Sequence, residues 1–150
     1  MFFLKELPTR QMLETYSERY PGMNAEAVAE ALRLLRRGSL LMRELDAYFT
    51  GHTLSQTRFL VMIVIDRELE RKSLLASEIA DRLDISRPVV TETVKALSQA
   101  GLLSSIPDPE DGRAKRITLT PNGQAVLASL LPGYFAIIAD FMARPADRTG

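Results

Sequence analysis

The sequence contains no cysteine and a single histidine, His52. Without cysteine there is no disulfide framework, no thiolate nucleophile and no thiol-based redox sensor. Because Cys and His supply most structural zinc ligands, one histidine also argues against a zinc site. An excess of one charge is missing too, since 19 basic residues balance 19 acidic ones. Net charge therefore neither favours nor opposes a nucleic-acid partner, and the placement of the charges has to decide.

Long hydrophobic runs are also absent. The longest uncharged apolar run, Phe59–Ile65, is far shorter than a membrane span. The charges of Lys5 and Glu6 come too early for a secretory signal. We therefore expect a cytoplasmic protein with no membrane partner. A length of 150 residues, 46% of them hydrophobic, suggests one domain or one domain with appended helices.

The residue pairs of the common enzymes are missing as well. One histidine and no cysteine leave no usual nucleophile–base pair, and no glycine-rich phosphate loop is present. Asp66 and Glu70 have helical spacing, but they stand among other charges, which indicates a solvated face. We predict that the protein is not an enzyme and has neither a cofactor nor a metal.

Helix signals dominate the first half of the chain. Thr9 can cap a short helix that stops at Pro21-Gly22, and Asn24 can cap a long helix that extends to about Phe49. Apolar residues recur at three- and four-residue steps along that long helix. Thr53–Gln56 reads as a capping box with Thr53 as the cap, followed by a buried helix to about Glu70.

A helix-turn-helix is predicted in the middle of the chain. A short helix at Leu75–Leu83 is followed by a tight turn and by a second helix from Ser86 to about Gln99. Ser86 is a good N-cap, and Pro88 lies in the first turn, where a missing N–H costs nothing. Gly101 is placed to end this second helix.

A hairpin and a last helix follow. Leu102–Ile106 and Arg116–Leu119 are β-prone, and Pro107–Gly112 between them is dense in turn formers. Thr120-Pro121 caps the next helix, which we expect Pro132-Gly133 to kink or break.

The segment SEIADRLDISRPVVT, Ser77 to Thr91, resembles the MarR family of bacterial transcription regulators. The match continues in the hairpin run DPEDGR (Asp108–Arg113) and in ITLTPNG (Ile117–Gly123), and it covers about residues 25–135. The resemblance implies a symmetric dimer with one winged helix-turn-helix per subunit. It also implies binding to palindromic DNA operators, often relieved by a small aromatic or anionic effector.

The expected fold is mostly α (α+β), a winged helix-turn-helix with flanking dimerisation helices. Residues 1–53 form N-terminal dimerisation helices and residues 54–120 the DNA-binding domain. Residues 121–150 form a C-terminal dimerisation helix and a frayed tail. The family usually has a further long helix after the position of Met142, so we expect the N-terminal segment with its aromatics to share in the dimer interface.

Some positions differ from the family's pattern. Asp84 stands where the family often has glycine. Glu92 and Ala96 stand where a basic residue is common, and Ser104-Ser105 replaces a frequent arginine. Each of the last three changes removes a potential phosphate contact, which predicts modest DNA affinity.

The predicted DNA contacts lie on the second helix of the helix-turn-helix, for the major groove, and on the hairpin, for the minor groove and phosphates. They are Ser86, Arg87, Pro88, Thr91, Glu92, Lys95, Arg113, Lys115 and Arg116. In this prediction Arg113 matches the family's wing arginine, with Asp111 as its brace.

An effector pocket is predicted between the dimerisation helices and the DNA-binding lobe, with Tyr48, His52 and Arg58. An arginine can hold a carboxylate, and tyrosine and histidine can hold a phenol. The function predicted from these features is a ligand-responsive repressor that binds double-stranded operator DNA as a homodimer. Two alternatives remain open: a winged-helix protein-interaction module, and a MarR-like activator.

Overall fold

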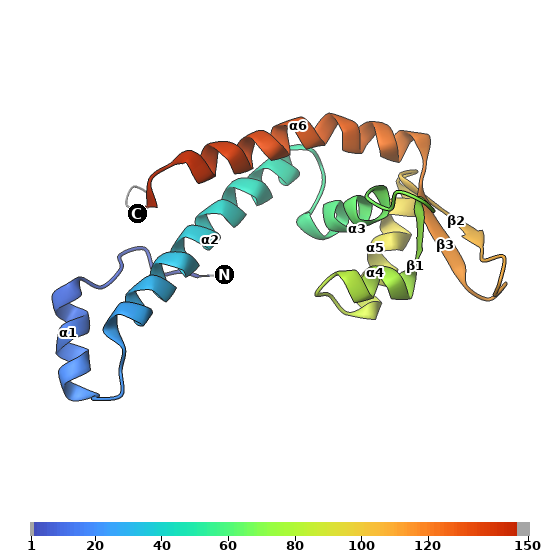
Figure 1. The fold of residues 1–150 in the computed structure, drawn as a ribbon. Coiled ribbons are helices and arrows are strands. Elements are labelled where there is room, and N and C mark those ends of the chain that lie inside the picture. Colours follow the sequence, from blue (N-terminus) through green and yellow to red (C-terminus); the bar gives the residue numbers. More distant parts are fainter. Residues whose placement is uncertain (1, 147–150) are drawn as a thin grey trace. The chain divides into compact units, whose positions relative to one another are not determined.

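The computed structural model describes residues 2–146 and shows the chain as six helices and three strands among them (Figure 1). The elements are α1 (Arg10–Arg19), α2 (Ala25–Gly51), α3 (Gln56–Asp66), β1 (Ser73–Leu75), α4 (Ala76–Arg82), α5 (Arg87–Gln99), β2 (Leu103–Pro107), β3 (Lys115–Leu119) and α6 (Pro121–Ala143). Part of the predicted frayed tail, residues 147–150, lies outside the described residues.

The chain packs as two compact units. The helical unit consists of the chain up to Ala47 and from Ala136 onward, and the winged unit extends from Tyr48 to Phe135. Helices α2 and α6 each contribute residues to both units.

The N-terminal helices of the helical unit begin at the predicted caps. Thr9 Oγ1 accepts a hydrogen bond from the backbone N–H of Met12 at 3.2 Å, and Asn24 Oδ1 accepts one from Ala27 at 3.0 Å. Each bond satisfies one of the amides that a helix start leaves without a partner. Within α1 only Leu13 is buried, so α1 contributes little to the core of this unit.

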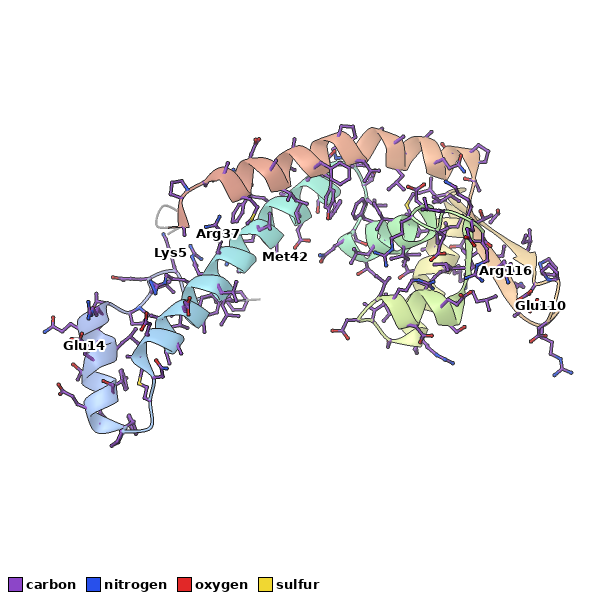
Figure 2. All side chains as sticks on the ribbon, in the orientation of Figure 1. Lys5, Glu14, Arg37, Met42, Glu110 and Arg116 are labelled. Atoms are coloured by element: carbon purple, nitrogen blue, oxygen red, sulfur yellow. The ribbon has the colours of Figure 1, made fainter. Side chains whose placement is uncertain are left out.

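Arginines fasten the end of α6 to α2 in the helical unit. Arg37 Nη2 donates to the carbonyl oxygens of Met142 at 3.4 Å and Arg144 at 3.3 Å. Arg144 in turn pairs with Glu44. Arg37 is labelled in Figure 2. A cation beside the last carbonyls of a helix is favourable, because these groups carry partial negative charge and have no partner within the helix.

The core of the winged unit is built on α3, which is buried as its composition predicts. Phe59 and Met62 have at most 1% of their surface exposed. The start of this helix differs from the prediction. The cap is Ser55, whose Oγ accepts from the Arg58 N–H at 3.1 Å. Thr53 has a φ of 56°, and this left-handed backbone is not the extended conformation that an N-cap needs.

A three-stranded antiparallel sheet of order β1-β3-β2 completes the winged unit. The predicted hairpin is confirmed, with Leu103 opposite Leu119 and Pro107 opposite Lys115. Strand β1 was not predicted from the sequence. It adds to the hairpin through β3, where Leu74 pairs with Ile117 and both side chains are buried.

Helix α6 begins at the predicted cap, since Thr120 Oγ1 accepts from the Gly123 N–H at 2.9 Å. Of the predicted kink or break at Pro132-Gly133, the break is wrong, because α6 continues through Pro132 to Ala143. The missing N–H of an interior proline costs about 3 kcal/mol. Packing offsets that cost: Tyr48 donates its hydroxyl to Leu130 O at 2.8 Å, and its ring occupies the space where a side chain at position 133 would lie.

Helix α6 is also the most apolar of the long helices in the described chain. By length and composition alone it could cross a membrane, and only 17% of its most apolar stretch is buried, with a mean hydropathy of 1.8. One helix of this kind is weak evidence for a membrane protein. Among the described residues, most of this apolar stretch is left uncovered.

Candidate nucleic-acid interface

The two helices of the helix-turn-helix are α4 and α5. Helix α5 buries Val90, Thr93 and Leu97 and exposes its other face. The hydroxyl of the buried Thr93 is satisfied by donating to Val89 O at 2.7 Å, and Val94 beside it is half-buried.

The predicted contact residues of α5 lie on its exposed face or just before it. Ser86 is at the N-cap position, although its side chain accepts no hydrogen bond from the helix. All of the predicted contacts on this helix are exposed to solvent, namely Ser86, Arg87, Pro88, Thr91, Glu92 and Lys95. The face is therefore available to a partner such as the major groove, whose width admits a helix.

A cleft of ≈ 450 Å³ lies between α5, the start of α4 and the hairpin. Thr91 and Lys95 line it from α5, and Lys115 lines it from β3. Hydroxyl groups of Ser98 and Ser105 belong to the same lining. The structure thus brings together three predicted DNA contacts from two elements, with two ammonium groups on one hollow surface.

The tip of the hairpin, residues 108–114, is closed by its own hydrogen bonds. The Asp108 N–H donates to Ala114 O at 2.9 Å, and Asp108 Oδ1 accepts from the Glu110 N–H at 3.0 Å. Asp111 Oδ1 accepts from the Arg113 N–H at 3.0 Å. Asp111 therefore holds the backbone of Arg113, whose side chain is exposed. We call β2, this tip and β3 the wing.

Arg116 differs from the other predicted DNA contacts. Its Nε lies 3.5 Å from Asp108 Oδ1, and the two side chains are 18% and 7% exposed. One terminal nitrogen, Nη1, is buried without a hydrogen-bond partner. Figure 2 shows Arg116 farther back along the hairpin than Glu110, which is at the tip.

The start of α4 is organised by Glu78, which the sequence analysis did not single out. Its carboxylate accepts from the Leu75 N–H at 3.1 Å and from Arg71 Nη2 at 3.0 Å, and Arg82 lies within 3.8 Å. The Leu75 amide, followed by Arg71 and Arg82, lowers the pKa of Glu78 below its ordinary value, against a smaller opposing effect of burial. The sequence signal for this role is a Glu three residues after the N-cap position. The usual capping box also needs a Ser or Thr at the N-cap, and Leu75 stands there instead.

The three predicted effector residues all lie in the winged unit. His52 and Tyr48 are together: His52 Nδ1 is 2.8 Å from Tyr48 O, and the ring centroids are 4.4 Å apart. Arg58 is exposed, and its side chain forms no hydrogen bond with either of them. Among residues 2–146 no group of His, Asp and Glu side chains is arranged to hold a metal ion.

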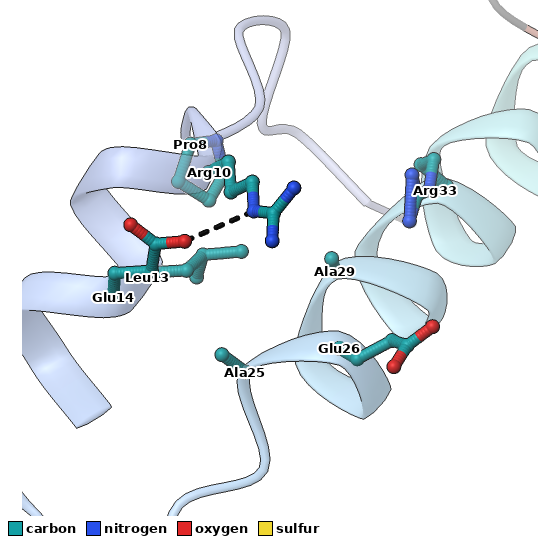
Figure 3. A pocket seen from close by; sticks show the side chains of 8 residues that line it. All are labelled: Pro8, Arg10, Leu13, Glu14, Ala25, Glu26, Ala29 and Arg33. Carbon is teal, nitrogen blue, oxygen red and sulfur yellow. Dashed lines mark hydrogen bonds and ion pairs between the residues drawn. The ribbon is translucent and has the colours of Figure 1, made fainter.

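A separate hollow of ≈ 460 Å³ lies between α1 and α2 in the helical unit (Figure 3). Leu13 and Ala29 contribute apolar lining, and Arg33 contributes a charge. Arg10 and Glu14 also line it, paired at 2.9 Å. None of the predicted effector residues belongs to this hollow.

Residues 51–114 match the family model described as MarR family. Over this stretch, which contains the helix-turn-helix and most of the wing, the chain is similar to the MarR family of transcription regulators. The resemblance read from the helix-turn-helix and wing is thereby confirmed. The prediction that the chain is not an enzyme is confirmed as well, since the family consists of transcription regulators.

Individual relatives agree with this resemblance. The transcriptional repressor YetL of Bacillus subtilis (strain 168) is 29% identical over 145 residues, which is 96% of this chain and 86% of that protein. The structure of Sco3205 of Streptomyces coelicolor in complex with DNA has a TM-score of 0.73 at 22% identity, covering 79% of this chain and 74% of that one. Bordetella bronchiseptica BpsR, whose DNA binding is regulated by 6-hydroxynicotinic acid, has a TM-score of 0.65 at 21% identity, covering 77% and 81%. The two structures confirm the winged-helix fold.

Proposed function

We propose that this protein is a MarR family transcription regulator that binds duplex DNA with α5 in the major groove and the wing beside it. The cleft that joins Thr91 and Lys95 to Lys115 carries the proposal. Two cationic side chains from different elements converge there, although the chain as a whole has no net charge. Such a local arrangement suits the phosphate backbone.

Each predicted contact has a place in this proposal. Thr91 and Glu92 face base edges, with Glu92 able to accept from cytosine, and Lys95 and Lys115 neutralise phosphates. Ser86, Arg87 and Pro88 form the start of the helix that enters the groove. Arg113 at the wing tip enters the minor groove, where a narrow A·T-rich segment attracts arginine. The pairing of Arg116 with Asp108 gives it another role, argued below.

We also propose that the protein acts as a homodimer. Helix α6 leaves most of its apolar stretch uncovered, and Leu34 of α2 is 72% exposed. Apolar surface of this extent calls for a partner. A second copy is the partner that also fits the function, since the two-fold symmetry of a dimer matches a palindromic operator. The N-terminal segment, with Tyr16 and Tyr20 exposed at its surface, belongs to this interface in the proposal.

Repression relieved by a small effector is the proposed mode of action, in the cytoplasm. Two similar proteins support it: YetL is a repressor, and the DNA binding of BpsR is regulated by 6-hydroxynicotinic acid. The effector class is a small aromatic anion, with Tyr48, His52 and Arg58 as the proposed contacts. Arg58 is exposed and its guanidinium is not engaged with either of the other two, so it can take a carboxylate.

A comparison of Arg113→Ala with Lys115→Ala tests the DNA-binding mode. The probe is a duplex selected from a random pool by the wild-type protein, prepared with A·T-rich and with G·C-rich flanks. Lys115→Ala should weaken binding to selected and random duplex equally. It should lower the slope of log affinity against log salt by about 0.9 per subunit, because one phosphate contact is lost.

Arg113→Ala should in addition flatten the preference for A·T-rich flanks, since those flanks narrow the groove that it enters. An Arg113→Ala variant that keeps the flank preference and behaves like Lys115→Ala would show that Arg113 does not enter the minor groove. A wild-type protein that binds no duplex at moderate salt would instead indicate a protein-interaction module.

A further inference from the structure

Asp108 and Arg116 form a charge pair inside the wing. The proposed DNA contacts do not require this pair. Asp108 is a carboxylate with only 7% of its side chain exposed, at the point where β2 passes into the tip. Arg116 lies in β3, and the hairpin register places it opposite Ile106 and therefore beside the start of the tip. This register brings Arg116 Nε to 3.5 Å from Asp108 Oδ1, although the two residues are eight positions apart in the sequence.

Asp108 has two further tasks at the same place. Its Oδ1 accepts from the Glu110 N–H, and its own N–H closes the tip by donating to Ala114 O. The next turn of the tip, in which Asp111 holds the Arg113 amide, lies within this closed segment. Asp108 therefore fixes both ends of the segment that carries Arg113.

We propose that the Asp108–Arg116 pair positions the wing tip, so that Arg113 is aimed at the minor groove, and that Arg116 is a positioning residue that acts through this pair. The proposal rests on the proposed DNA-binding function. The Arg116 side chain is only 18% exposed and its Nη1 is buried without a partner, so it would have to give up its one carboxylate partner to reach a phosphate. Taking one partner from a buried charge pair is costly, because it leaves the other charge uncompensated.

Arg116 could be a phosphate contact that Asp108 holds back, or a residue that positions the wing tip through Asp108. These two roles predict opposite results for Asp108→Asn. This substitution removes the charge while leaving an oxygen that can still accept from Glu110. If Asp108 merely held Arg116 back from the backbone, Asp108→Asn would tighten binding and steepen the salt slope, because a cation is released and an anion is removed from a DNA-facing hairpin. If the pair positions the tip, the variant loses flank preference.

The proposal is tested by titrating wild type, Asp108→Asn, Arg116→Gln and the double variant with the selected duplex carrying A·T-rich or G·C-rich flanks. We expect each variant to reduce the ratio of the two affinities about fivefold, the scale of a lost readout contact. The double variant should lose no more than either single variant, because one pair has been broken in all three. The double variant also has no uncompensated buried charge, because both members of the pair are neutral. It therefore tests the role of the pair even if one of the single variants folds poorly.

Glu110→Gln is the matched control. It removes one negative charge from the same tip, at an exposed side chain. We expect this control to bind slightly more tightly and to keep the wild-type flank preference, which separates a general charge effect from loss of position.

A second measurement needs no DNA. Hydrogen exchange of the free protein should be faster across residues 108–114 in Asp108→Asn than in wild type or Glu110→Gln, because the Asp108–Ala114 closure is loosened. Unchanged exchange, or an unchanged flank preference in Asp108→Asn, would overturn the positioning role. If wild type binds the duplex and Arg113→Ala loses the flank preference while Asp108→Asn keeps it, the positioning role alone fails. A wild type that binds no duplex overturns the proposed function itself.

Discussion

The winged unit and the helical unit differ in how far each covers its own apolar surface. In the winged unit the large side chains of α3 and the sheet, such as Phe59, Met62 and Leu74, are at most 1% exposed. In the helical unit Leu34 is 72% exposed, and Met142 is 58% exposed. The winged unit closes a core of its own, whereas the helical unit leaves much of its apolar surface exposed.

The helical unit also contains a buried polar atom without a partner. Arg36 of α2 is only 7% exposed, and its Nε is buried without a hydrogen-bond partner. Buried polar groups in finished structures almost always have partners. The difference between the units is therefore that the winged unit, which we propose contacts DNA, has a core of its own, while the helical unit, which we propose forms the dimer, leaves apolar surface exposed.

The largest expected effect comes from breaking the core of the winged unit. Phe59 stacks on Phe49 with ring centroids 4.6 Å apart and lies 4.8 Å from Tyr134. Phe59→Ala should lower the free energy of unfolding by about 3–5 kcal/mol, because it removes a large buried ring and leaves a cavity. Denaturant titration measures this. Leu69→Ala, at an 86% exposed position, is the control and should stay within about 0.5 kcal/mol. Equal losses in both would contradict a closed core centred on α3.

The next largest effect concerns the helical unit. A substitution on its exposed apolar surface should weaken the dimer and leave the fold intact. Leu34→Asp places a charge on the exposed apolar surface of α2 and should weaken the dimer at least tenfold, about 1.4 kcal/mol, with unchanged helix content. Sedimentation over a range of concentrations measures the dissociation constant. Leu69→Asp is the matched control, since it changes the same residue type at a still more exposed site in the winged unit. A dimer that tolerates Leu34→Asp as well as the control would place the interface elsewhere.

A smaller effect concerns the loss of folding stability at acid pH, to which Glu78 contributes. Because the folded pKa of Glu78 is lowered, its contribution to stability is present above the unfolded value near 4.5 and is lost as the pH falls through the folded value. Glu78→Gln should cost about 1–2 kcal/mol at neutral pH, since charge-assisted hydrogen bonds from Leu75 and Arg71 are weakened. The difference from wild type should shrink below pH 4.5. Thermal melts at neutral and acid pH measure this, and a difference that is independent of pH would show that the carboxylate charge is not what stabilises the start of α4.

Much of the winged unit could be predicted from the sequence, because turn chemistry and helix caps are local. Gly101, with a φ of 75°, ends α5, and the proline- and aspartate-rich run forms the tip. Strand β1 could not be predicted, since three residues carry no periodicity and pair only because β3 is already in place. The choice of Ser55 over Thr53 as cap likewise depended on a backbone conformation that the pattern does not specify.

The candidate site could be predicted in part for the same reason. The exposed face of α5 follows from helical periodicity, so Thr91 and Lys95 were found on it. Their meeting with Lys115 in one cleft, and the pairing of Asp108 with Arg116, depend on hairpin register and on packing between distant elements. Periodicity within one element contains no information about either.

Hydroxyl-radical footprinting of the wild-type protein on its selected duplex is the most direct test of the central claim, that α5 and the wing read DNA in a symmetric dimer. The account predicts two protected segments related by two-fold symmetry, their centres about one helical turn (10–10.5 base pairs) or a multiple of it apart. Protection should extend into the flanking minor groove on each side in wild type and should be lost there in Arg113→Ala. A single protected segment, or none, would contradict the account.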